Sequence, residues 1–284
     1  MSLEALLNKV ATQGKDQSQA SAGGGDFAPA EKGTTGARLV GYYEVGQFEE
    51  EWEGKKKKVN KAITVWELVG KKHPPRELDD GTKIPVRITM EVSISDYQNS
   101  GFYKLFSKLR TEETHFSQLL GKAFLLDIVH KEREKGGKKV VYANIDRNSI
   151  RKPVLLERAD LADPESELIE KPYPVGAALT PINAFIWEFA DAERWDAIRI
   201  DGEYPARVND KGEETAPARS KNTIQLKIAS ALNFKGLPCY DYAASRLAGD
   251  GKVTAEDTAN LAAAVGDVEN AAQPDPEDPM AGIG

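Results

Sequence analysis

Residues 84–110, IPVRITMEVSISDYQNSGFYKLFSKLR, pass from a strand pattern to a helix pattern and decide the fold of this chain. Over 84–93 an apolar side chain recurs at every second position, which is the period of a strand with one face in a core. Over 100–110 the period becomes that of a helix, and its apolar face is formed by Phe102, Leu105, Phe106 and Leu109. We therefore predict a strand followed by a helix.

Four further strand patterns surround this pair. Two precede it, at 37–47 (ARLVGYYEVGQ) and 59–70 (VNKAITVWELVG), and two follow it, at 123–132 (AFLLDIVHKE) and 140–150 (VVYANIDRNSI). The run KGGKK between the last two is typical of a hairpin loop. Five strands with a helix between the third and the fourth is the element order of an OB-fold. We therefore predict a β-rich α+β protein with an OB-like five-stranded barrel.

The chain divides into four regions by composition. We expect a short helix and a flexible linker over 1–36, the OB-like domain over 37–158, a helical extension packed on the barrel over 159–248, and a short helix with an acidic disordered tail over 249–284. Within the extension, one helix is predicted to start at Pro181 and another near Ser220.

Charge is distributed unevenly among these regions. The whole chain has a net charge of -7, yet residues 37–158 hold 24 Lys and Arg against 18 Asp and Glu, a net charge of +6. Residues 249–284 hold 1 basic and 8 acidic residues. A basic domain with an acidic tail favours a polyanion-binding protein whose tail competes for the site or recruits a basic partner. The alternative is a solvated charged face with a solubilising tail.

Clustered cations provide candidate phosphate contacts. The run Lys55, Lys56, Lys57 and Lys58 lies between the first two predicted strands, in a loop with which OB-folds grip nucleic-acid backbone. The alternative is a hairpin tip neutralised by the nearby Glu49, Glu50, Glu51 and Glu53. We add three cations of the predicted strands to the candidate set: Arg38, Lys61 and Arg87.

Aromatic side chains near these cations are candidates for base stacking. Tyr42 and Trp66 are the chosen pair, because strand alternation sets both opposite the most apolar faces of their strands. A shift of one residue in register would exchange Tyr42 for Tyr43. We assign Phe102, Phe106 and Phe124 to the core.

Signatures of catalysis and of metal or cofactor binding are absent from the sequence. One cysteine and three histidines do not supply a zinc cage, and no phosphate-cradling glycine loop of the Walker type occurs. We therefore expect no enzyme, no cofactor and no metal. No apolar run is long enough to span a membrane, and the N-terminus lacks a secretory signal, so a cytoplasmic protein is expected.

Four segments carry a resemblance to a known family: GGGDFAPAEKG (23–33), GKKKKVNKAITVWELVG (54–70), LLGKAFLLDIVHKE (119–132) and VVYANI (140–145). Together they resemble bacteriophage single-stranded DNA-binding proteins of the OB-fold type. The resemblance implies a protein of the host cytoplasm that coats single strands in DNA replication, recombination or repair. It also implies an acidic C-terminus that contacts replication proteins, although this chain ends in PEDPMAGIG without an aromatic cap.

Two other functions remain as alternatives. One is a single-stranded DNA-binding transcription cofactor that recruits a phage polymerase through the C-terminal region. The other is a virion or assembly module in which the barrel binds a protein and no nucleic acid. A homo-oligomer is compatible with all three.

Overall fold

The computed structural model of the chain describes residues 29–52, 54–78, 80–135, 138–159, 165–208, 212 and 214–249. The predicted N-terminal helix and linker and the predicted helix and tail of the acidic C-terminus lie outside these residues, apart from the end of the linker region and Gly249. No helix in the described part of the chain is long and apolar enough to cross a membrane.

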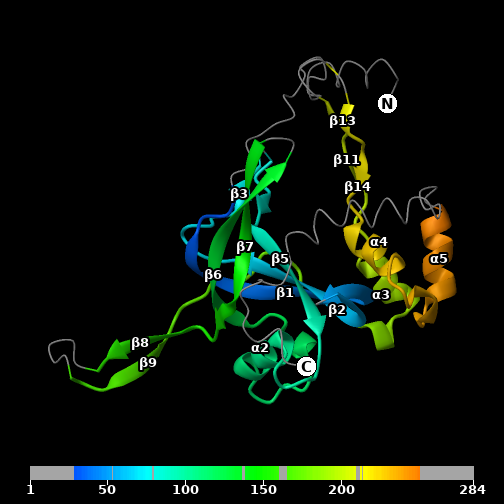
Figure 1. Ribbon diagram of the computed structural model, residues 1–284. Coiled ribbons are helices and arrows are strands. Elements are labelled where there is room, and N and C mark those ends of the chain that lie inside the picture. Colours follow the sequence, from blue (N-terminus) through cyan, green and yellow to red (C-terminus); the bar gives the residue numbers. More distant parts are fainter. Residues whose placement is uncertain are drawn as a thin grey trace, which may run out of the picture.

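Five antiparallel strands form the main sheet, in the order β5-β2-β1-β6-β7 (Figure 1). They are β1 (Gly33–Trp52), β2 (Lys55–Leu68), β5 (Arg87–Ile94), β6 (Ala123–Lys135) and β7 (Lys138–Arg151). Helix α2 (Gly101–Leu109) lies between β5 and β6 in the chain, and the side chain of Ser100 caps it by accepting a hydrogen bond from the Tyr103 N–H. The predicted order of five strands and one helix is confirmed.

The sheet curls without closing by hydrogen bonds. Its outer strands β5 and β7 contact each other, and α2 contacts both of them. In the described residues no ladder joins β5 to β7, so the expected closed barrel is not observed. The buried Leu105 and Leu109 of α2 join the core beneath the curled sheet.

The inner face of the sheet packs into a first core around Tyr42, Trp66 and Phe124. Phe116, from the 3-10 helix η1 (Phe116–Leu119), stacks on Tyr42 at 5.5 Å between ring centroids. Trp66 Nε1 donates a hydrogen bond of 2.9 Å to Thr64 Oγ1, so the indole is satisfied inside the core.

Two irregularities in β1 change which side chains face this core. The pairing with β2 shifts between Leu39 and Gly41 and again between Glu44 and Gly46. A bulge adds one residue to one strand, so Leu39 and Tyr42 both reach the first core although three positions separate them. The simple alternation expected over 37–47 is therefore wrong.

A second core lies in the C-terminal lobe, which we define as residues 183–200 and 222–249. Its helices are α3 (Ala192–Ala197), α4 (Thr223–Ala229) and α5 (Tyr240–Gly249), with the 3-10 helices η2 (Trp187–Phe189) and η3 (Phe234–Gly236). Trp195 is fully buried at its centre. The helix predicted near Ser220 is confirmed as α4, whereas α5 was not predicted.

The lobe joins the sheet through β10 (Asn183–Phe185), which pairs in parallel with Gly41–Tyr43 of β1. The helix predicted to start at Pro181 is therefore wrong. A helix there would set Ile182, Phe185 and Phe189 on one apolar face, but Ile182 is 57% and Phe189 is 72% exposed, while Phe185 is buried. At the same junction Gly46 has a φ of +98°, and a Cβ there would lie 2.5 Å from Trp187.

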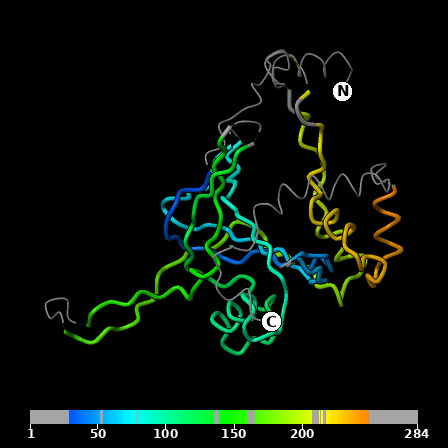
Figure 2. Tube along the Cα trace, in the orientation of Figure 1, coloured from blue at the N-terminus to red at the C-terminus, as the bar shows by residue number. Residues whose placement is uncertain are grey.

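Short two-stranded ladders extend from this body. Two arms project in Figures 1 and 2: the green β8–β9 pair forms one, and the yellow pairs that include β11 and β14 form the other. The pairs are β3 (Arg76–Glu77) with β4 (Lys83–Ile84), β8 (Val154–Arg158) with β9 (Leu168–Pro172), β11 (Glu203–Tyr204) with β14 (Arg219–Ser220), and β12 (Arg207–Val208) with β13 (Glu214–Ala216).

Candidate nucleic-acid interface

One face of β1, β2 and β5 lies opposite the first core. It carries Arg38, Lys61 and Arg87, the three strand cations that the sequence predicts to bind phosphate. Strand register arranges its side chains in cross-strand rows. The first row is Arg38, Glu67 and Arg87, the second is Gly41, Val65 and Thr89, and the third is Tyr43, Ile63 and Glu91. We call this surface the outer face, and its two ends are covered differently from its middle.

The strap, residues 175–180, covers Arg38 and Glu67 of the first row. The Arg38 guanidinium donates hydrogen bonds of 2.5 to 3.0 Å to the carbonyl oxygens of Gly121, Val175 and Gly176. All three guanidinium nitrogens are therefore engaged with backbone. The prediction that Arg38 binds phosphate is not supported, because its side chain holds the strap on the sheet.

Lys61 lies at the other end of the outer face and is also engaged internally. Its side chain is 8% exposed, and Nζ lies 2.7 Å from Glu91 and 3.0 Å from Glu50. Lys227 of α4 contacts Glu91 at 3.3 Å. Burial alone would lower the pKa of Lys61, but the two carboxylates raise it above its ordinary value. The predicted phosphate contact is therefore corrected to a buried ion pair under α4.

Tyr42 and Trp66 do not reach the outer face. Both are 0% exposed, and both belong to the first core. The bulge at Leu39 and Gly41 turns Tyr42 inward, and Trp66 lies directly across the ladder from Leu39. Neither ring offers a face to a base, so the predicted stacking pair is wrong.

Between the strap and α4, the middle of the outer face is partly accessible. Arg87 and Thr89 are exposed and Val65 is half-buried, whereas Tyr43 and Ile63 are half-buried because they pack against the second core. The Tyr43 ring lies over Gly41, where a Cβ would meet it at 2.8 Å, so glycine permits this close approach. Burial raises the pKa of Tyr43 above its ordinary value, and the nearby charge of Arg87 partly offsets the rise. The outer face thus carries a half-buried aromatic ring on β1 and an exposed cation on β5, with β2 between them.

The four lysines of the β1–β2 hairpin are exposed, as predicted, but they face acidic partners. Register sets Lys58, Lys57 and Lys56 opposite Glu49, Glu50 and Glu51. Lys56 pairs with Glu49 at 2.7 Å, and hydrogen bonding to Glu49 raises the pKa of Lys56. Lysines and glutamates that face each other reduce the positive electrostatic potential of the hairpin tip. For Lys56 this favours the alternative of a neutralised hairpin tip over a phosphate contact. Lys55 is exposed at the end of the ladder.

The sequence prediction missed a second aromatic residue with cations beside it. Tyr204 of β11 is 48% exposed, and its ring has Arg219 and Lys221 each 5.5 Å from the centroid. Arg219 is its direct cross-strand partner. No local pattern reveals this cluster, because it depends on pairing between segments 15 residues apart in a region of weak periodicity.

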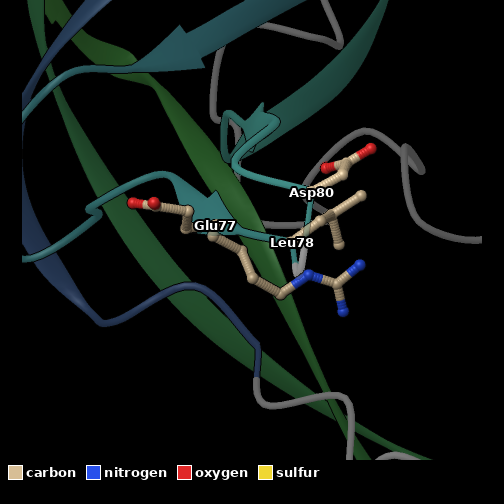
Figure 3. Close-up of a pocket in the computed structure, with 4 residues that line it drawn as sticks. Glu77, Leu78 and Asp80 are labelled. Atoms are coloured by element: carbon tan, nitrogen blue, oxygen red, sulfur yellow. The ribbon is translucent and has the colours of Figure 1, made fainter.

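Other surfaces offer less chemistry. Figure 3 shows a hollow at the β3–β4 hairpin, where Glu77, Leu78 and Asp80 lie beside Arg76. It is open to solvent and lacks the apolar walls of a small-molecule site. In the part of the chain that the structure describes, no group of three His, Cys, Asp or Glu side chains is arranged to hold a metal ion.

Comparison with known proteins adds no family: no protein-family model matches the chain, and no curated protein is significantly similar to it in sequence. The class defined by the fold is a β-rich α+β protein with a five-stranded antiparallel sheet. Its accessible outer face carries Tyr43 and Arg87.

Proposed function

We propose that this protein is a non-catalytic single-stranded DNA-binding protein that coats its ligand with little sequence preference. The middle of the outer face is the binding surface, and its centre is formed by Tyr43 and Arg87. The observation that carries the proposal is the presence of an aromatic ring and an exposed cation on one face of the first three strands of an OB-like strand order.

The fold supports the proposal through its topology. The order β5-β2-β1-β6-β7, with α2 between β5 and β6, is that of an OB barrel opened between its third and fifth strands. OB-folds bind single strands on the face of their second and third strands, which correspond to β2 and β5. The accessible part of the outer face lies on these two strands and on the adjoining part of β1.

The chemistry of the face agrees with a ligand of unpaired bases. The half-buried Tyr43 offers the exposed part of its ring for stacking, Val65 supplies apolar surface, and Arg87 supplies a charge for phosphate. Stacking tolerates every base, because each base has a π-face, so weak sequence preference is expected. The resemblance to phage proteins supports a role in DNA replication, recombination or repair.

The test is a fluorescence-anisotropy titration of the full chain with a labelled dT oligonucleotide and with a duplex, at two salt concentrations. We expect tighter binding to the single strand, with affinity that falls as salt rises. Arg87→Ala should lower the salt slope by about one. Tyr43→Leu should weaken binding roughly tenfold, and Tyr43→Phe should keep most of it.

Matched controls are Arg194→Ala on α3 and Tyr97→Leu in the turn before α2, both exposed and away from the outer face. Equal losses in the controls would remove the outer face from the proposal. No binding to either oligonucleotide at low salt would overturn single-stranded DNA binding and favour the protein-interaction module.

A further inference from the structure

One aromatic ring and two cations form a cluster on the ladder of β11 and β14, outside the outer face. Tyr204 is 48% exposed, and its ring centroid lies 5.5 Å from both Arg219 Cζ and Lys221 Nζ. Tyr204 and Arg219 are cross-strand partners, and two positions along the ladder the Lys221 N–H donates a 3.0 Å hydrogen bond to the Gly202 carbonyl oxygen. Pairing of the two strands therefore builds the cluster.

Strand alternation separates this cluster from its acidic neighbours. Residues 199–221 hold five basic and five acidic residues, so the segment as a whole is neutral. Side chains two positions apart on a strand share a face, which sets Glu203 on the opposite face of the ladder from the cluster. Asp201 is paired with Arg199 at 2.7 Å. One face of the ladder is thus cationic and aromatic. We call it the ladder face, and its residues are Tyr204, Arg219 and Lys221.

The charged groups of the ladder face are available to a ligand. Arg219 is exposed and Lys221 is half-buried, and in the described residues no side-chain hydrogen bond or ion pair engages either of them. Arg38, Lys61 and Lys56 differ, because oxygens of their own chain already bind their charged groups. Arg219 and Lys221 can therefore bind phosphate oxygens without breaking an internal hydrogen bond or ion pair.

The ladder face lies near the α4 end of the outer face. Helix α4 begins two residues after Lys221, and Lys227 of α4 contacts Glu91, in the third row of the outer face, at 3.3 Å. Two extended steps and four helical steps separate the Cα atoms of Lys221 and Lys227, a span of about 13 Å. Figure 1 shows the yellow ladder leading into α4. A flexible strand of a few more nucleotides can therefore reach from one surface to the other.

We propose that the ladder face is a second contact for the same single strand that the outer face binds, so that the DNA passes α4 between the two surfaces. The inference rests on the proposed function and adds a path for the ligand. A base stacks on the accessible part of the Tyr204 ring, while Arg219 and Lys221 bind neighbouring phosphates.

The combination of ring and cations selects this ligand over other polyanions. An acidic peptide would use the two cations and leave the exposed ring without a partner. A duplex offers phosphates, but its base faces are covered by stacking within the helix. Only an unpaired strand presents base faces and phosphates together, which is the pattern of the ladder face.

The test is an anisotropy titration of the full chain with a short and a long labelled dT oligonucleotide, of about 6 and about 20 nucleotides, since one OB fold covers about 4–16. Tyr204→Ala should weaken binding of the long oligonucleotide roughly tenfold, and Tyr204→Phe should keep it. Arg219→Ala with Lys221→Ala should lower the salt slope for the long oligonucleotide by about 1.4, at about 0.7 per phosphate. Binding of the short one should stay unchanged, which also shows that each variant has folded.

Matched controls are Phe189→Ala and Lys235→Ala, which change an exposed ring and an exposed lysine of the C-terminal lobe. Photo-cross-linking adds a direct readout: oligonucleotides that carry iodouracil are irradiated with the wild-type chain, and mass spectrometry identifies the aromatic residues joined to them. We expect Tyr204 among these residues with the long oligonucleotide and not with the short one.

The outcomes separate the two proposals. Ladder-face variants that bind the long oligonucleotide as the wild type does overturn the second contact and leave binding at the outer face in place. Equal losses in the controls, or no cross-link to Tyr204, also overturn the second contact alone. A wild-type chain that binds neither oligonucleotide overturns the proposed function, and the second contact with it.

Discussion

Glu67 of β2 holds Leu179 of the strap, 112 residues further along the chain, by a 2.7 Å hydrogen bond from the Leu179 N–H to Oε1. Oε2 of the same carboxylate accepts a second 2.7 Å bond from the Thr180 N–H. Glu67 is 2% exposed, so both bonds lie away from water. One buried carboxylate thus fixes the position of the strap on the outer face.

Replacing this carboxylate tests its role. Glu67→Gln keeps the size of the side chain, but its amide has one accepting oxygen, so one of the two N–H groups loses its partner. We expect a loss of about 1–3 kcal/mol in the free energy of unfolding, measured by urea denaturation. The control Glu77→Gln, on the exposed β3–β4 hairpin, should leave the urea midpoint equal to that of the wild type within experimental error. Equal midpoints for Glu67→Gln and the wild type would contradict the role.

The neighbours Tyr42 and Tyr43 should separate stability from binding. Tyr42→Ala removes a fully buried ring, and we expect a loss of about 3–5 kcal/mol in the free energy of unfolding. Tyr43→Ala removes a half-buried ring and should cost about 1 kcal/mol. Thermal or urea unfolding of both variants measures the difference. Similar losses of unfolding free energy at the two positions would contradict the finding that Tyr42 lies in the first core and Tyr43 on the outer face.

The main sheet was predictable because its signals are local and repeated. In β5 the alternation of Ile88, Met90 and Val92 with polar residues runs through the whole strand, and α2 keeps its apolar face for two turns. The bulges of β1 were not predictable. Leu39, Val40, Tyr42, Tyr43 and Val45 include apolar side chains at both odd and even positions, so the hydrophobic pattern does not show where the extra residue lies.

β10 was missed for a related reason. Asn183, Ala184 and Phe185 form too short a strand to show a period, and its partner segment in β1 lies about 140 residues away. The site predictions failed where a segment distant in the sequence covers the predicted side chain. Arg38 and Lys61 point outward as expected, but nothing in the local sequence shows that the strap covers the one and α4 the other. Arg87 remained accessible because neither segment reaches it.

The buried charges around Glu91 should respond unequally to removal. Glu91→Gln removes the carboxylate that Lys61 and Lys227 share, and removing one partner of a buried ion pair costs up to about 3–5 kcal/mol. Lys61 keeps its contact with Glu50, so we expect a loss below the top of that range. Lys227→Met leaves Glu91 paired with Lys61 and should cost less. Urea denaturation of both variants gives the comparison. A larger loss for Lys227→Met would show that Glu91 is not the centre of the cluster.

Alkaline pH should destabilise the fold through Tyr42. Burial raises the pKa of its hydroxyl above the ordinary 10.0, and the nearby carboxylate of Glu44 raises it further. The folded chain keeps this proton at a pH where the unfolded chain loses it. The contribution of Tyr42 to stability is therefore complete below pH 10.0 and decreases as the pH rises above that value.

Ultraviolet absorbance of tyrosinate measures this effect. Tyr42 is fully buried, so it should ionise only as the chain unfolds. Tyr42→Phe should remove one tyrosine from the late step. A titration in which every tyrosine ionises together below the unfolding transition would contradict the burial of Tyr42.

β10 pairs in parallel with Gly41–Tyr43, so during synthesis on the ribosome this edge of β1 must wait for a segment that is translated much later. At about 5–20 residues per second, the partner segment emerges on the order of ten seconds after β1. Through that interval the edge of β1 at Gly41–Tyr43 lacks the strand that finally pairs with it, and an unpaired edge is a template for aggregation. The nascent chain is therefore most vulnerable after its sheet has formed and before its last 100 residues are complete.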